Sequence, residues 1–202
     1  HEPHQFGSRR VRKEFAVPYS KLHLAWRLPC SAHPDTPALS ALSSILGGGR
    51  SARFYEKFHD RLGLVYSIEV HSNQSETDEG AFTISMDVDR AQRDKVRDLV
   101  LQELRNLAEE DFTEDLKRVC KQTRVSRLRR RSSASGVASE MGADWFGSRN
   151  LNLSSEWQEA IERVTTEDLH RVCSTWLSSP NVTEVSLDPP GSNEIGRASC
   201  RE

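Results

Sequence analysis

Hydrophobic and polar residues alternate with two different periods along this chain, and these periods predict its elements. Residues 21–29, "KLHLAWRLP", place Leu22, Leu24 and Trp26 against polar or small neighbours, and residues 80–88, "GAFTISMDV", alternate in the same way. A period of two is typical of a strand with one buried face. Three further segments have a strand-like composition, namely residues 9–17, 64–73 and 181–189.

Helical spacing accounts for the segments between these strands. The first helix is expected to begin at Asp35 or Thr36, with Pro37 in its first turn, and to stop at Gly47. A second helix is predicted over residues 51–62, because its phenylalanines recur four residues apart. Further helices are predicted over residues 91–108, 113–131 and 139–146, and then in the segments 154–164 and 165–177.

Capping residues mark where three of these helices begin. Thr113 is expected to be the N-cap of the helix that follows it. The pairs Ser155 with Gln158 and Thr165 with Asp168 have the spacing of a capping box, in which each side chain satisfies a free backbone N–H. The last helix is expected to bury one stripe, made of Leu169, Val172, Cys173 and Trp176.

The predicted order of elements is β-β-α-α-β-β-α-α-α-α-β. Strands come in adjacent pairs rather than alternating singly with helices, and "PYS" at residues 18–20 is expected to turn the chain between the first two. We therefore predict an α+β fold, with a mainly antiparallel sheet and helices packed on one face. One domain of this kind is expected over residues 1–190, followed by a tail at residues 191–202.

Composition and charge narrow the class of protein. The chain has 202 residues, 36% of them hydrophobic and 29% charged, with a formal net charge of −2. This balance predicts a globular core and no nucleic-acid partner, and the basic run at residues 127–131 is interpreted as a solvated helix end. No apolar run approaches the ~18 residues of a membrane span, so none is expected.

The two ends of the chain carry their own expectations. Residues 1–15 contain no apolar segment of a signal peptide and no initiator Met, so the chain is expected to begin inside a longer protein, and no cellular location is assigned. Residues 194–202, "EIGRASCRE", resemble a translated sequencing adapter and are expected to be non-native. The four cysteines, one of them in this tail, are too scattered for a disulfide framework and are interpreted as buried thiols.

Three consecutive glycines, Gly47 to Gly49, are the most conspicuous local feature. The run follows a helix and lacks both G-x-x-x-x-G-K-[ST] and G-x-G-x-x-G, so a phosphate site is not expected. Two interpretations remain open. The glycines form a tight connection between two helices, or they let the backbone approach a bound chain closely.

Patterns that would indicate a catalytic centre are absent from the sequence. There is no H-x-x-E-H for a zinc hydrolase and no G-x-S-x-G for a serine hydrolase. "HEPH" at residues 1–4 has two histidines, but Pro3 and the terminal position disfavour a rigid site. We therefore predict that this chain has no catalytic residue, no metal ligand and no cofactor of its own.

A longer stretch resembles a known family. Residues 33–70, "HPDTPALSALSSILGGGRSARFYEKFHDRLGLVYSIEV", are similar to the non-catalytic domain of the pitrilysin/insulinase zinc peptidases, which include the mitochondrial processing peptidases. The family pattern is L-x-G-G-x-S-S-R-L-Y followed by L-G-L-A-Y-S. The matching positions are Leu46, Gly48, Gly49, Ser51, Arg53, Phe54, Tyr55, Leu62, Gly63, Leu64, Tyr66 and Ser67.

The resemblance extends over about residues 2–188 and implies an architecture. In this family two homologous α+β halves close around a peptide substrate. One half carries H-x-x-E-H and binds zinc, whereas the other lacks it and contributes walls and substrate contacts. This chain resembles the second half, so the resemblance implies a homologous catalytic half as partner, with zinc in that half.

The resemblance also implies substrate-binding residues. In some family members an arginine and a tyrosine from this region help to bind the substrate carbonyl. Here Lys57 lies near the expected arginine, with Arg53 as an alternative donor, and Tyr66 lies two positions beyond the expected tyrosine. Together with Gly48 and Gly49, these residues are the predicted contacts to the peptide.

Two functions of different class remain as hypotheses. The first is a non-catalytic, substrate-binding half of a zinc metallopeptidase that encloses and positions peptides. The alternative is a structural subunit without a proteolytic role, since relatives of this family serve as scaffolds; a free-standing peptide-binding module is a weaker third. H-x-x-E-H in the same gene or a neighbouring one would favour the first.

Overall fold

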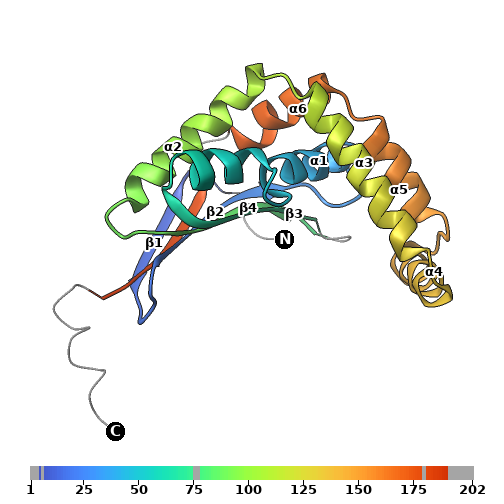
Figure 1. Cartoon of the computed structure of the whole chain (residues 1–202), viewed down its shortest axis with the longest axis horizontal. Coiled ribbons are helices and arrows are strands. Elements are labelled where there is room, and N and C mark those ends of the chain that lie inside the picture. The colour runs from blue at the N-terminus through green and yellow to red at the C-terminus, as the bar shows by residue number, and fades with distance from the viewer. Residues whose placement is uncertain (1–4, 6, 75–77, 179–180, 191–202) are drawn as a thin grey trace, which may run out of the picture.

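Five strands form a single sheet in a computed structural model that describes residue 5 and residues 7–74, 78–178 and 181–190. The order across the sheet is β1-β5-β2-β4-β3 (Figure 1). Only β1 and β5 run parallel, and the other three pairings are antiparallel, which confirms the predicted mainly antiparallel sheet. The strands are β1 Arg9–Glu14, β2 Ser20–Leu28, β3 Val65–Asn73, β4 Gly80–Val88 and β5 Thr183–Asp188.

The first two strands are consecutive in the chain but are not neighbours in the sheet. The chain reverses direction between them, as "PYS" predicts, yet β5 inserts between β1 and β2. All residues of β1, "RRVRKE", are exposed, whereas Glu184, Ser186 and Asp188 of β5 are buried. A strand as charged as β1 is better tolerated at a sheet edge, where it also discourages pairing with other chains.

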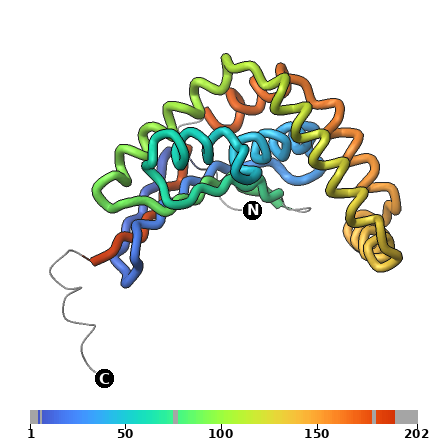
Figure 2. The backbone as a smooth tube through the Cα atoms, viewed as in Figure 1, coloured from blue at the N-terminus to red at the C-terminus, as the bar shows by residue number. Residues whose placement is uncertain are grey.

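The helices lie over one face of the sheet, as predicted (Figures 1 and 2). The strand alternation predicted from the sequence is confirmed, because the inward residues of β2 and β4 are buried and lie opposite each other as Leu22 with Met86, Leu24 with Ile84 and Trp26 with Phe82. The helices are α1 Thr36–Gly47, η1 Tyr55–Arg61, α2 Arg93–Asn106, η2 Leu107–Glu109, α3 Thr113–Arg130, α4 Ala134–Ser148, α5 Leu153–Glu162, α6 Thr166–Val172 and η3 Cys173–Leu177.

Three helices form an arm that projects beyond the sheet. We use "the arm" for α3, α4 and α5, and "the body" for the sheet with α1, η1, α2, α6 and η3. In Figures 1 and 2 the arm extends to one side of the sheet, with α4 at its tip. The inner ends of α3 and α5 bury Leu116, Val119 and Ile161 in the core, which anchors the arm to the body.

The number and form of the helices differ from the sequence prediction in two places. Between β4 and β5 the described chain has five α-helices, which correspond to the five segments predicted as helical, although the predicted order of elements counts only four. The helix predicted over residues 51–62 is largely a π-helix, η1, in which the N–H of Leu62 donates to the carbonyl of Lys57 at 3.1 Å. Phe54 and Phe58 are buried as predicted, but Leu62 is exposed.

One of the three predicted caps is confirmed. Thr165 and Asp168 form the capping box at the start of α6. Thr113 is instead the first residue of α3, and its N–H and hydroxyl donate to the Asp111 carboxylate at 2.9 and 2.7 Å. Ser155 lies inside α5, after an Asn152 N-cap, and its hydroxyl accepts a hydrogen bond from Arg127. In both cases a side chain outside the helix, Asp111 or Arg127, forms a hydrogen bond with the residue expected to cap it.

The final helical segment buries only part of its predicted stripe. Leu169, Val172 and Cys173 are buried, and burial raises the pKa of the Cys173 thiol to about 12. Trp176 is half-buried, and its indole N–H donates to the Asp35 carboxylate at 2.9 Å. Cys30 and Cys120 are half-buried rather than buried. The predicted non-native tail at 194–202 lies outside the described residues.

Candidate functional site

The glycine run sits where α1 meets β3 and turns towards η1. A Cβ atom on Gly47 would lie 2.5 Å from the backbone nitrogen of Val70, so only glycine permits this contact. Gly47 therefore belongs to α1 rather than stopping it, and Gly48 is the C-cap. Gly49 has a φ of +104°, a backbone conformation that favours glycine. The interpretation as a tight connection thus explains the run without a ligand.

Arg53 is held by acidic residues just before and within the first turn of α3. Its Nε donates to Asp115 at 2.7 Å, and its Nη1 contacts Glu110. Its Nη2 donates to the carbonyl of Asp111 at 2.5 Å, and the guanidinium lies 4.6 Å from the centre of the Phe112 ring. These contacts tie the start of η1 to the start of α3, so in this arrangement Arg53 is a structural link.

Lys57 lies in η1, about one turn after Arg53. Its Nζ donates to the Glu103 carboxylate of α2 at 2.5 Å, while the side chain remains almost half exposed. Lys57 and Arg53 both line a hollow of about 460 Å³ between η1 and α2. The remaining lining residues are Glu56, Arg61, Leu62, Glu103 and Glu110.

Tyr66 occupies a different position from these two cations. It lies in a β-bulge at the start of β3, because Val65 and Ser67 face Val88 and Asp87 while Tyr66 has no partner residue opposite. Its side chain is 53% exposed, and its ring packs 4.1 Å from that of Tyr19. The structure therefore brings Arg53 and Lys57 together, whereas Gly48, Gly49 and Tyr66 are not among the residues lining their hollow.

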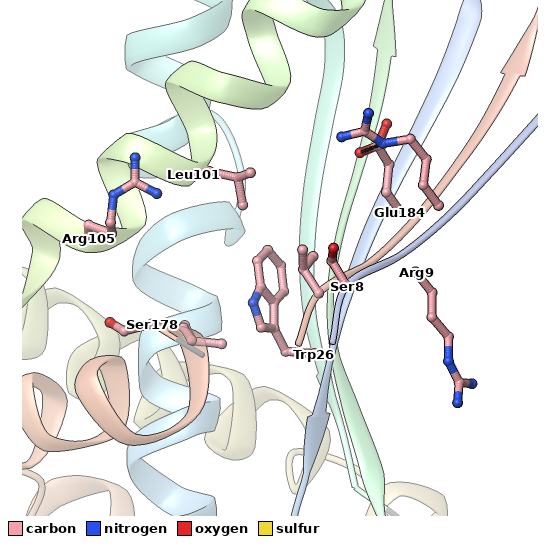
Figure 3. A pocket seen from close by; sticks show the side chains of 10 residues that line it. Ser8, Arg9, Trp26, Leu101, Arg105, Ser178 and Glu184 are labelled. Carbon is pink, nitrogen blue, oxygen red and sulfur yellow. Dashed lines mark hydrogen bonds and ion pairs between the residues drawn. The ribbon is translucent and has the colours of Figure 1, made fainter. Parts of the chain in front are cut away.

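A larger cavity, of about 640 Å³, lies between the sheet edge, α2 and η3. Figure 3 shows Leu101 and Arg105 reaching into it from α2, Trp26 standing in the middle and Glu184 on the opposite side. Its apolar residues could accommodate a hydrophobic group, with Arg105 near an anionic one. No local pattern in the sequence indicates this cavity, because its residues come from segments far apart: Ser8, Arg9, Arg10, Trp26, Leu101, Arg105, Leu177, Ser178, Val182 and Glu184.

Buried charges line the region between the sheet edge and α2. Glu184 accepts a hydrogen bond from Arg10 at 2.8 Å, and Arg97 lies 3.7 Å from it. Asp188 contacts Arg93 and accepts a hydrogen bond from Ser20 at 2.7 Å. Burial opposes ionisation of Asp188, but these hydrogen bonds outweigh it and lower its pKa. The charges are paired across β5 and α2, so they stabilise the packing of these elements.

The described part of the chain has neither a cluster of metal ligands nor a membrane-spanning helix. No group of three or more His, Cys, Asp or Glu side chains there is placed to hold a metal ion. The described residues of this chain therefore offer no site for zinc, which the resemblance places in the catalytic half. No described helix is both long and apolar enough to cross a membrane.

Comparisons with known proteins connect this fold to zinc proteases. The sequence profile of the family described as "Peptidase M16 inactive domain" matches residues 1–123. The zinc protease PqqE of Helicobacter pylori is 23% identical over 194 residues, which cover 93% of this chain and 43% of that protein. The chain thus spans less than half the length of this curated relative.

Solved structures share the fold. The peptidase M16 inactive domain from Pseudomonas fluorescens superposes with a TM-score of 0.78 at 20% identity, covering 94% of this chain and 45% of that one. An inactive peptidase domain from Bordetella parapertussis gives a TM-score of 0.72 at 18% identity, covering 87% of this chain and 94% of that one. With the profile matching more than half of its residues, the chain belongs to the peptidase M16 inactive-domain family, the non-catalytic domain of pitrilysin-type zinc peptidases.

Proposed function

We propose that this chain is the non-catalytic half of a zinc metallopeptidase and helps to enclose and position peptide substrates. Its partner would be a homologous catalytic half that carries H-x-x-E-H and the zinc, in the same polypeptide or in a separate subunit. The observation that carries the proposal is the family match over residues 1–123. The zinc protease of Helicobacter pylori, matched over almost all of this chain, supports the same pairing.

Within this function, Lys57 and Tyr66 are the proposed donors to the substrate. Lys57 presents a charged amine at the rim of a hollow, and Tyr66 presents an exposed phenol. Both can donate a hydrogen bond to a carbonyl that gains negative charge in the transition state. Arg53 would hold this region in place through Glu110 and Asp115, and the exposed Gly48 and Gly49 would leave room for the peptide backbone.

Reconstitution with the catalytic half tests this role. Tyr66→Phe and Lys57→Ala should each lower kcat, by on the order of 10²-fold if the lost donor serves the transition state. Tyr55→Phe and Lys121→Ala provide matched controls, since they remove the same groups elsewhere on the chain. Circular dichroism of each variant checks that the fold is retained.

Two outcomes would count against the proposal. Wild-type kcat in both Tyr66→Phe and Lys57→Ala would remove these residues from the substrate site while leaving the pairing of the halves intact. A catalytic half with full activity on its own, unchanged by this chain, would contradict the proposed function and favour a structural subunit.

A further inference from the structure

Helix α4 at the tip of the arm turns its charged residues inwards and exposes large apolar residues. Its only charged residues are Glu140 and Asp144, and both point inwards. Glu140 accepts hydrogen bonds from Arg127 and Arg131 of the preceding segment at 3.1 and 3.0 Å. Asp144, which is 4% exposed, accepts from the backbone N–H and the hydroxyl of Ser154 at 3.1 and 2.7 Å. Charged groups thus fasten α4 to its neighbours.

The outer face of the same helix has three large apolar side chains among small residues such as Ser135 and Ser139. Met141 is 46% exposed, Trp145 is 45% exposed and Phe146 is 81% exposed. A surface helix of a globular protein ordinarily turns its hydrophobic side to the core and its charged side to solvent. In α4 this arrangement is reversed, and Asp144 is the one buried residue of the helix.

The exposed side also has room for a partner to approach closely. Met141 and Trp145 lie four residues apart, so they form one row along the helix, and the half-buried Val137 begins this row. The adjacent row contains Ala138 and Gly142 before Phe146, and a Cβ atom on Gly142 would meet no other atom within 4 Å. The face therefore presents large apolar side chains beside a shallow strip of small residues.

We infer that the outer face of α4 is the surface on which the catalytic half docks. This inference rests on the function proposed above and adds the place of contact to it. Apolar centres with few charges are typical of permanent interfaces, whereas transient ones are more polar. A face of this composition would be unfavourable in water if it stayed uncovered.

The relative lengths of the proteins indicate what covers it. This chain corresponds to 43% of the Helicobacter pylori zinc protease and 45% of the Pseudomonas fluorescens chain. More than half of each of those chains therefore lies outside the region that corresponds to this one. In Figures 1 and 2, α4 lies at the end of the arm farthest from the sheet, where it projects away from the body.

The charges around this face further define the partner. Arg149, which follows α4, is exposed, and no ion pair is found for it among the described residues. The Arg149 guanidinium lies 5.5 Å from the Trp145 ring, directly beside the apolar face. The matching surface on the catalytic half should therefore have an apolar centre and an acidic group opposite Arg149.

Binding between separately expressed halves tests the inference. The probe is the H-x-x-E-H half encoded with this chain, titrated against wild-type chain, Phe146→Ser and Phe15→Ser by calorimetry. Phe15 is a matched control, because it is another largely exposed phenylalanine, in the connection between β1 and β2. Phe146→Ser should raise Kd about tenfold or more, whereas Phe15→Ser should leave it unchanged. Both substitutions replace exposed groups, so both proteins should fold normally.

The outcomes separate this inference from the proposed function. Tight binding by wild-type chain and by Phe146→Ser alike would overturn the inference and leave the function standing. No binding by wild-type chain would overturn both. Self-association of the isolated chain that is lost in Phe146→Ser would assign the face to a second copy and overturn the inference. Binding to phosphatidylglycerol vesicles that is lost in Phe146→Ser would assign the face to a membrane surface, with the same consequence.

Discussion

The body and the arm of this protein are stabilised by opposite arrangements of the same kinds of side chain. In the body, α1 and η1 bury aromatic and aliphatic residues such as Phe58 and Leu42 on the sheet. At the tip of the arm, α4 buries Asp144 and leaves Phe146 in solvent. The body is held chiefly by the hydrophobic effect, and the tip by hydrogen bonds and ion pairs.

This difference is the one expected if the outer face of α4 is covered in an assembly, as proposed above. An isolated domain gains stability by burying its apolar residues, and α4 does not do so. If the outer face of α4 is covered in the complete enzyme, the same rule holds there once the partner is included. The comparison can therefore be tested by placing identical substitutions in the two regions.

The largest contrast is expected from two phenylalanines. Phe58→Ala in η1 removes a fully buried ring that packs edge-on at 5.4 Å against Phe54, so it should cost about 3–5 kcal/mol. Phe146→Ala in α4 removes a ring already in solvent and should change stability by no more than about 0.5 kcal/mol. Urea unfolding of the two variants measures both. A large loss in Phe146→Ala would mean that its ring packs against the fold in solution.

The next contrast concerns the charged side of the arm. Asp144→Ala leaves Ser154 without its acceptor and should weaken the tip by about 1–3 kcal/mol. The loss should appear locally, as amide hydrogen exchange in residues 134–148 that is roughly 5- to 150-fold faster. Glu114→Ala is the control, because Glu114 forms a fully exposed pair with Lys117 that should contribute little. Uniformly faster exchange across the body would show that the arm does not open separately.

The third prediction concerns how the stability of the body depends on pH. Burial opposes the charge on Asp35, but hydrogen bonds from Trp176 and Arg171 outweigh it and lower its pKa, and the pKa of Asp188 is lowered similarly. A carboxylate with a lowered folded pKa stabilises the fold above its unfolded pKa near 3.9. That contribution is lost as pH falls through the folded value, by about 1.4 kcal/mol for each unit of difference.

Urea unfolding between pH 3 and pH 7 measures this effect. The free energy of unfolding of the wild-type chain should fall below about pH 4, and Asp188→Asn should flatten part of that fall because the titrating group is gone. Asp188→Asn keeps the shape of the side chain, so its fold can be checked at pH 7. A wild-type profile that stays level from pH 5 to pH 3 would contradict the lowered pKa values.

The two regions also differ in how far the sequence could predict them. The alternation of Phe82, Ile84 and Met86 identified β4 correctly, because a strand in the body buries one whole face. Only residues 139–146 of α4 were predicted as helix, because this helix depends on distant partners, such as Arg127 for Glu140 and Ser154 for Asp144. Its exposed apolar face cannot be distinguished in the sequence from a face turned to the core.

The candidate site could also be predicted only in part from the sequence. The family pattern singled out Arg53 and Lys57, and the structure places both at one hollow. Their acidic partners Glu103, Glu110 and Asp115 lie at least 46 residues away in the chain, so local spacing could not reveal that both cations are already paired. The insertion of β5 between β1 and β2 escaped prediction for the same reason, since it joins the two ends of the described chain.

The smallest expected effects come from two glycines that differ only in backbone conformation. A Cβ atom would meet nothing within 4 Å at either Gly63 in the body or Gly142 in the arm. Gly63 has a φ of +59°, so Gly63→Ala should destabilise by about 1 kcal/mol. Gly142 lies inside α4, where Gly142→Ala should stabilise the helix by about 0.5–1 kcal/mol.

Thermal unfolding and hydrogen exchange of both alanine variants measure these opposite signs. Because the space around each position is equally open, steric crowding cannot account for a difference between them. A destabilising Gly142→Ala would mean that α4 is not the regular helix described. A stabilised Gly142→Ala variant that binds the catalytic half more weakly would instead mean that the added methyl group obstructs the strip of small residues at the docking face, which would connect this smallest effect to the assembly of the two halves.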